Sequence, residues 1–207
     1  MSQAAVLDSV NNPRQPFGLP LGSVRGFLSL LICGFFWIVL LLPDTQPLQA
    51  LLAHFFMLVL VVLLFSPYSK WDNVSDVGPR TLPWALRVIC VGGSIAVVAF
   101  VAVKFPERLS TRLTPDPNEV KDWWATYLAV TAGGFSFGQL LRFVLGRQNP
   151  IFQTLRAWMS LLAMLLLLGE ILFWVAINSA ENKPEEFIHI YQAFDLGLIA
   201  AYFGTRA

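Results

Sequence analysis

The sequence predicts an all-α integral membrane protein with six transmembrane helices arranged as three hairpins and with both termini in the cytoplasm. Composition is the first indication, because 56% of the 207 residues are hydrophobic and only 13% are charged, whereas a soluble domain carries about 25% charged residues. The second is a series of six apolar runs whose lengths approach the roughly 20 residues that a helix needs to cross the hydrocarbon core. The third is the unequal charge of the loops that join them.

The apolar runs define the expected spans in order. Residues 1–23 form a polar arm that contains prolines, and residues 24–207 form one six-helix membrane domain. The spans are expected at about residues 26–42, 48–65, 84–103, 123–144, 157–177 and 187–203. Only five residues, two of them proline, separate the first two runs, so these form a tight antiparallel hairpin. Residues 107–113, between the third and fourth runs, are expected to form a short interfacial helix.

Loop charges predict the orientation. With both termini and the second and fourth loops on one side, that side holds nine basic and three acidic residues, and the other holds five basic and eight acidic ones. Because basic residues favour the cytoplasmic side, both termini are expected in the cytoplasm, most simply at a bacterial inner membrane. Three arginines at the starts of the odd-numbered runs are the expected orientation anchors: Arg25, Arg87 and Arg156. The sixth run is the weakest, but only six spans place Arg206 on the basic side.

Small residues recur at the spacing that lets membrane helices approach closely. They predict packing faces on the third, fourth and sixth spans. The residues of these faces are Gly92 and Ala96, then Gly134 and Gly138, and finally Ala193, Gly197 and Ala201. These faces are expected to join helices within the chain or to contact another subunit.

Ionisable residues inside the expected spans are the strongest functional indication. Asp195 lies at the centre of the sixth span, Glu170 lies beyond the centre of the fifth, and His54 lies near the middle of the second. Such groups are costly in a membrane and mark function by default. Two carboxylates in a low-dielectric site do not both ionise easily, so one is expected to hold a proton. This suits proton coupling or a cation site, and the alternative is a purely structural contact between helices.

Evidence for an enzyme is weak. Gly134-Phe135-Ser136-Phe137-Gly138 matches G-x-S-x-G, the motif of a hydrolase serine on a sharp strand-to-helix turn, but here it lies within an apolar helix. Ser136 in the fourth span and His189 in the sixth resemble the serine and histidine of the rhomboid intramembrane proteases. The resemblance covers only these residues, and the two differ in expected depth by about 10 Å or more. Catalytic residues are therefore not assigned.

No cofactor or metal is expected. Cys33 and Cys90 lie at different expected depths, which disfavours a disulfide. His189 with Glu185 and Glu186 lacks the second histidine of a typical zinc site. No glycine-rich loop follows a strand, and no charge pattern indicates nucleic acid.

These observations lead to three hypotheses about function. The leading one is a non-enzymatic, multi-pass subunit or scaffold of a larger membrane assembly, with the lipid bilayer and other membrane subunits, or further copies of the chain, as partners. The alternative is a small transporter or channel that couples to protons or cations through Asp195 and Glu170, with His54. An intramembrane hydrolase ranks third.

Overall fold

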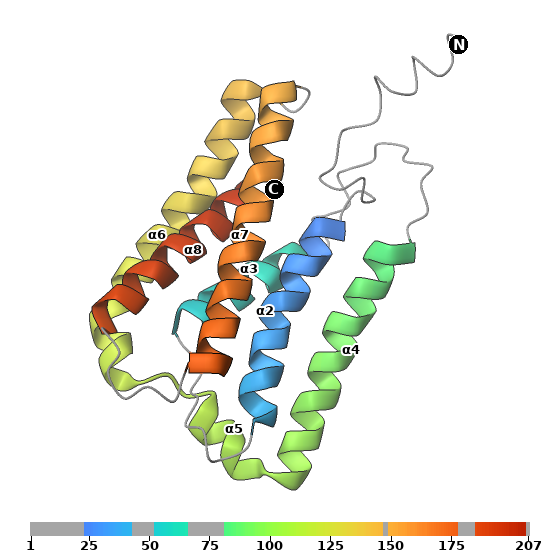
Figure 1. Ribbon diagram of the computed structural model, residues 1–207, viewed down its shortest axis with the longest axis vertical. Helices are drawn as coiled ribbons and strands as arrows, with labels where there is room; N and C mark the ends of the chain where they lie inside the picture. Colours follow the sequence, from blue (N-terminus) through green and yellow to red (C-terminus); the bar gives the residue numbers. More distant parts are fainter. Residues whose placement is uncertain (1–22, 43–51, 66–80, 147–148, 178–184, 206–207) are drawn as a thin grey trace.

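The computed structural model describes residues 23–42, 52–65, 81–146, 149–177 and 185–205, and these residues form an all-α protein of seven helices. The expected all-α fold is confirmed, and the described residues contain three long apolar candidate spans and two shorter apolar helices. The helices are α2 (Ser23–Leu41), α3 (Leu52–Phe65), α4 (Thr81–Lys104), α5 (Pro106–Arg112), α6 (Pro117–Leu145), α7 (Pro150–Ile177) and α8 (Glu185–Gly204) (Figure 1).

The long helices run in two opposite directions. In Figure 1, α2, α4 and α7 begin at the upper end and run downward, whereas α6 and α8 run upward, and α5 lies at the lower end. We call the lower end the α5 end and the upper end the basic end. Arg25 is the third residue of α2, and Arg87 and Arg156 are each the seventh residue of their helices, so all three lie toward the basic end.

Three helices are long and apolar enough to cross a membrane: Trp84–Lys104 in α4, Pro117–Leu145 in α6 and Pro150–Phe173 in α7. Two shorter apolar helices accompany them, Gly26–Leu41 and Leu52–Val62. This finding indicates an integral membrane protein. Helix α8 is not among these apolar helices, and it carries His189, Gln192 and Asp195.

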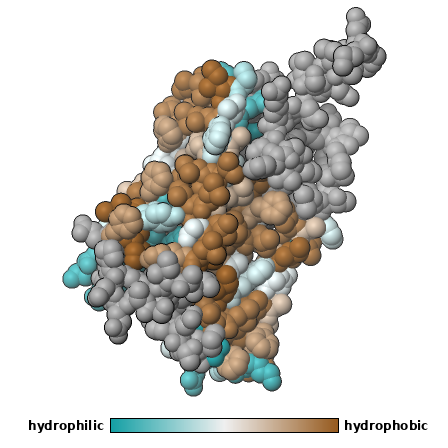
Figure 2. All heavy atoms as spheres, viewed as in Figure 1, coloured by the Kyte–Doolittle hydropathy of each residue, from teal (hydrophilic) through white to brown (hydrophobic). Residues whose placement is uncertain are grey.

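Large apolar side chains cover the outside of the bundle. Most of α4 and α6 is exposed, and Figure 2 shows apolar residues over much of the coloured surface. Val103, Phe143 and Trp158 are examples, each more than 60% exposed. A water-soluble monomer rarely exposes contiguous apolar area on this scale, so this surface suits lipid tails.

Two helices begin six or seven residues before their expected apolar runs. Helix α6 begins at Pro117 rather than near residue 123, because Asp116 caps it through a hydrogen bond from the Asn118 amide to Oδ1 (2.9 Å). Helix α7 begins at Pro150 rather than 157, because the side chain of Asn149 accepts a hydrogen bond from the Ile151 amide (2.9 Å). Asp or Asn at the N-cap followed by Pro at the first helical position is a strong start signal.

Helix α8 packs most extensively on α6 and also contacts α3 and α7. The contact with α6 depends on small residues, since a Cβ at Gly134 would lie 2.5 Å from the carbonyl oxygen of Gly197. A Cβ at Gly138 would overlap the backbone of Ala201, and one at Gly204 would overlap that of Phe135. The backbones of α6 and α8 are thus in direct contact, as the G-x-x-x-G spacing favours.

The expected packing face of α4 behaves differently. Gly92 and Ala96 are exposed, and nothing described lies within 4 Å of a Cβ built on Gly92. Within the described residues these two positions join no helices. The neighbouring Gly93 is the close-contact glycine instead, because it faces the ring of Trp37 on α2.

The two cysteines are free and buried. They nevertheless lie side by side, because the thiol of Cys33 on α2 is within hydrogen-bonding reach of Cys90 on α4. The expectation of different depths was therefore wrong. Helices α2 and α4 run in the same direction, and the indole Nε1 of Trp37 lies 3.1 Å from Oγ of Ser94. In this register, Arg87 lies farther from the basic end than Arg25 does.

Candidate functional site

The core of the bundle contains the three ionisable residues that the sequence singles out. Asp195 on α8, Glu170 on α7 and His54 on α3 are buried, with exposed fractions of 0%, 4% and 0%. They come from three helices that are separated in sequence, and α8 contacts both of the others. We call these three residues the polar centre.

His54 connects α3 to the polar centre. Its ring stacks on Phe35 of α2 with 3.8 Å between ring centroids, and its Nε2 lies 3.6 Å from Oε2 of Glu170. His54 is the third residue of the described α3, so it lies in the first turn and not near the middle of a helix as expected. Residues 48–51, which the expected span included, lie outside the described residues.

Three further side chains extend the site from Glu170 toward the α5 end. The Gln192 amide donates from Nε2 to Oε1 of Glu170 (3.0 Å) and accepts at Oε1 from the Tyr127 hydroxyl (3.0 Å). The Tyr127 oxygen lies 3.0 Å from Nδ1 of His189. Since the Tyr127 proton is directed to Gln192, the arrangement favours the tautomer in which His189 donates from Nδ1.

Glu119 completes this side of the site. Its Oε1 lies 3.9 Å from Nδ1 of His189 and accepts a hydrogen bond from the backbone amide of Leu52 (3.1 Å). The amide belongs to the first residue of the described α3, so the carboxylate also meets the favourable end of a helix dipole. Glu119 and His189 are partly exposed, at 8% and 18% of their side chains. The five residues from Glu119 to Glu170 thus join the surface near the α5 end to the polar centre; we call them the access chain.

Asp195 has a different environment. It lies within electrostatic range of Glu170 and Tyr191, but neither of its carboxylate oxygens has a hydrogen-bond partner among the described residues. The Tyr191 hydroxyl instead donates to the backbone oxygen of Leu166 (2.7 Å). Asp195 is therefore a fully buried carboxyl group with both oxygens available to a further ligand.

Charge balance restricts the protonation of the polar centre. With both carboxyl groups ionised and His54 neutral the centre would carry two negative charges, and with two more protons bound it is neutral. An uncompensated charge inside a membrane costs several kcal/mol or more. The neutral state with two protons is thus the stable one, and gaining or losing one proton changes the net charge by one unit.

The access chain was not predicted from the sequence, although the spacing of polar residues on α8 indicates part of it. His189, Gln192 and Asp195 recur at every third position of α8. Because a helix has 3.6 residues per turn, side chains three apart wind gradually around its surface. This explains how His189 meets α6, how Gln192 bridges Tyr127 of α6 and Glu170 of α7, and how Asp195 comes within electrostatic range of Glu170.

The serine of the G-x-S-x-G motif lies apart from this site. Ser136 is an exposed residue within the continuous helix α6. It lies nine residues beyond Tyr127, or about 13 Å along the helix, whereas His189 contacts Tyr127 itself. The structure does not bring Ser136 and His189 together.

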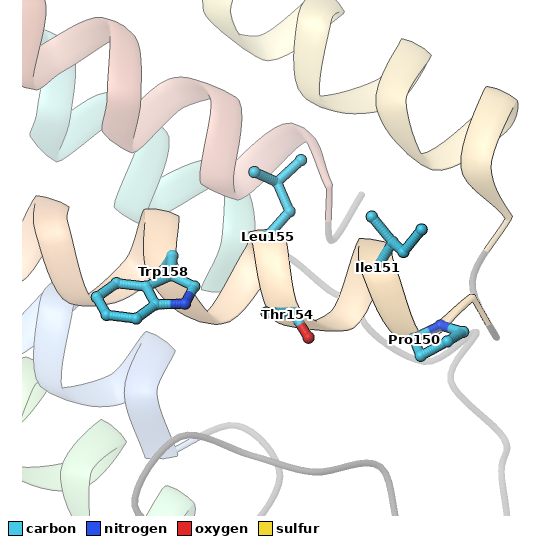
Figure 3. Close-up of a pocket in the computed structure, with 5 residues that line it drawn as sticks. All are labelled: Pro150, Ile151, Thr154, Leu155 and Trp158. Atoms are coloured by element: carbon cyan, nitrogen blue, oxygen red, sulfur yellow. The ribbon is translucent and has the colours of Figure 1, made fainter.

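Other candidate sites are weaker. Among the described residues, no three His, Cys, Asp or Glu side chains are grouped so that they could hold a metal ion. Figure 3 shows a surface hollow along the first turns of α7, lined by Pro150, Ile151, Thr154, Leu155 and Trp158. Its lining is mostly apolar and belongs to a single helix, so it offers no converging polar groups.

The geometry of the polar centre and the access chain is accordingly the basis for assigning a function. Comparison of the chain with protein-family models, curated proteins and solved structures finds no match.

Proposed function

We propose that this protein is a small proton-coupled membrane transporter or channel whose proton-binding site is the polar centre. The observation that carries the proposal is the burial of Asp195, Glu170 and His54 on three helices, with His54 lying 3.6 Å from Glu170 and Asp195 within electrostatic range of Glu170. A protein that needed polar groups only to join helices would gain little from two carboxyl groups within electrostatic range of each other. A site that exchanges a proton requires such groups.

The access chain supplies the route to one surface. His189 can bind and release a proton, the Tyr127 hydroxyl can pass one on because it both donates and accepts hydrogen bonds, and Glu119 attracts protons at the partly exposed end. Gln192 orients Glu170 and does not relay the proton itself, because an amide does not titrate. Transfer between Tyr127 and Glu170 therefore requires a bound water.

The proposal includes a topology. Six spans with both termini in the cytoplasm of a bacterial inner membrane would place the α5 end outside and the basic end inside. The loop charges support this orientation, and the grouping of Arg25, Arg87 and Arg156 toward one end is compatible with it. Protons would then enter the access chain from the outer surface.

Proton flux into liposomes that contain the purified protein tests the proposal. A potassium gradient with valinomycin drives the flux, and an internal pH-sensitive dye reports it. We expect the wild type to exceed empty liposomes at least threefold, and Asp195→Asn and Glu170→Gln to fall to the empty-liposome rate. Ser136→Ala, which changes an exposed residue of α6, should match the wild type. Wild-type flux equal to that of empty liposomes would refute the proposal.

A second candidate, a subunit of a larger membrane assembly, is favoured by the exposed small-residue face of α4. Gly92, Ala96 and Ala99 follow one another on one side of that helix and are exposed. Small residues at this spacing let another membrane helix approach closely. Gly92→Leu should remove a partner that co-purifies from native membranes, while Val91→Leu, on another side of α4, should retain it. Identical co-purification with both variants would count against this candidate.

A further inference from the structure

The core holds unpartnered polar groups on the side of the polar centre that faces the basic end. Both carboxylate oxygens of Asp195, the hydroxyl of Tyr202 and the hydroxyl of Ser29 are buried and have no hydrogen-bond partner among the described residues. The exposed fractions of these residues are 0%, 1% and 1%. A buried polar group without a partner costs about 1–3 kcal/mol, so such groups in native proteins generally bind water or an ion.

Asp195 and Tyr202 share one face of α8. They are seven residues apart, which places them about 20° apart around the helix and about 10 Å apart along it. Helical side chains tilt toward the N-terminus of their helix, so the Tyr202 hydroxyl extends back toward Asp195. This face is opposite the side of α8 on which Gly197 meets α6.

The Ser29 hydroxyl is a further buried polar group without a hydrogen-bond partner among the described residues. Ser29 is the seventh residue of α2, which begins at the basic end. Tyr202 and Ser29 are the buried residues whose hydroxyls have no hydrogen-bond partner within the described structure. Each hydroxyl both donates and accepts a hydrogen bond, as a proton-relaying group must.

We infer that bound water joins Asp195 to Tyr202 and Ser29, and that these groups form the exit by which a proton leaves the polar centre toward the basic end. This inference rests on the proposed function. In the transfer, the O–H bond of protonated Asp195 breaks and its proton passes to water. That water passes one of its own protons to the Tyr202 oxygen, and the tyrosine releases its original proton toward Ser29. Ser29 takes that proton and releases its own hydroxyl proton toward the basic end. One proton moves and no electrons are exchanged; the water, Tyr202 and Ser29 return to their starting composition, and Asp195 stays a carboxylate until the access chain supplies another proton to the polar centre.

Two measurements on the full-length protein in liposomes test the inference. The first is the proton flux described above. The second is modification of Asp195 by dicyclohexylcarbodiimide, which reacts with protonated carboxyl groups in apolar surroundings and reports whether the polar centre still receives protons. We expect Tyr202→Phe, which keeps the ring, to lower the flux in excess of the empty-liposome rate at least tenfold while Asp195 is modified as in the wild type. Ser29→Ala should lower the flux in the same direction.

Ser160→Ala is the matched control. Ser160 is as buried as Ser29, but its hydroxyl donates to the backbone oxygen of Ala157 (2.8 Å) and is satisfied within its own helix. Its flux should equal that of the wild type.

The outcomes separate the inference from the proposed function. Normal flux in Tyr202→Phe, with none in Asp195→Asn, would overturn the exit and leave the proton-binding centre standing. An absence of wild-type flux would overturn both. Protection of Asp195 from the carbodiimide by sodium ions would show that a cation, not water, occupies the position, and would also overturn the inference.

Discussion

At the scale of single residues, Arg112 illustrates how this chain satisfies polar groups without water. It is only 6% exposed, and its Nη1 donates to the backbone oxygens of Val39 (2.6 Å) and Leu42 (2.7 Å). These oxygens belong to the last turn of α2 and to the residue that follows it, where carbonyl groups have no partner in their own helix. The buried cation thereby caps α2 and fixes α5 against it.

Replacing Arg112 with methionine, which has a similar length and no charge, should destabilise the protein. Hydrogen bonds that involve a charged group contribute about 1.5–3 kcal/mol each, so a loss of about 2–3 kcal/mol is expected. Thermal unfolding in detergent measures it as a lower transition temperature. Lys121→Gln changes an exposed residue of α6 and should unfold like the wild type. Equal transition temperatures for all three proteins would show that Arg112 does not cap α2.

At the scale of helices, the contact between α6 and α8 depends on particular glycines. Gly133 and Gly134 are adjacent in sequence, yet a Cβ at Gly133 meets nothing described within 4 Å, whereas Gly134 and Gly138 face the backbone of α8. Both kinds of glycine weaken an isolated helix by about 1 kcal/mol relative to alanine. Because the two kinds of glycine differ in their surroundings, replacing each with alanine distinguishes the effect of helix propensity from the effect of helix packing.

Gly138→Ala should therefore destabilise the protein, because the added methyl group must push α8 away from α6. Gly133→Ala should leave stability unchanged or raise it by up to about 1 kcal/mol, since alanine is the better helix former. Unfolding of the two variants in mixed detergent micelles, followed by circular dichroism, gives the comparison. A Gly138→Ala variant as stable as Gly133→Ala would contradict the backbone contact.

The sequence predicted the positions of the helices only where hydrophobicity determines them. The apolar run marked the core of α7, but Asn149 and Pro150 set its start about two turns earlier, and such capping signals are independent of hydrophobicity. The G-x-x-x-G spacing correctly drew attention to Gly134 and Gly138. It gave the same weight to Gly92, because spacing cannot distinguish a side of a helix that faces protein from one that faces outward.

At the scale of the whole molecule, the polar centre could be predicted only in part. Asp195, Glu170 and His54 are conspicuous because each interrupts an apolar run. Their meeting in one core depends on how α3, α7 and α8 pack, which no local pattern contains. The bond from the Leu52 amide to Glu119 spans 67 residues, and nothing in the sequence near either residue indicates it.

The orientation of the whole molecule is the last property to test, because the direction of proton entry depends on it. With the α5 end outside, Asn118→Cys in the exposed first turn of α6 should react with a membrane-impermeant maleimide in cells whose outer membrane has been permeabilised. The wild type is the matched control and should not react, since Cys33 and Cys90 are buried. A green fluorescent protein fused to the C-terminus should fluoresce, because this protein matures in the cytoplasm and not after export. If Asn118→Cys is labelled but the fused green fluorescent protein does not fluoresce, the chain has five spans. If the fusion fluoresces but Asn118→Cys is not labelled, the α5 end lies in the cytoplasm.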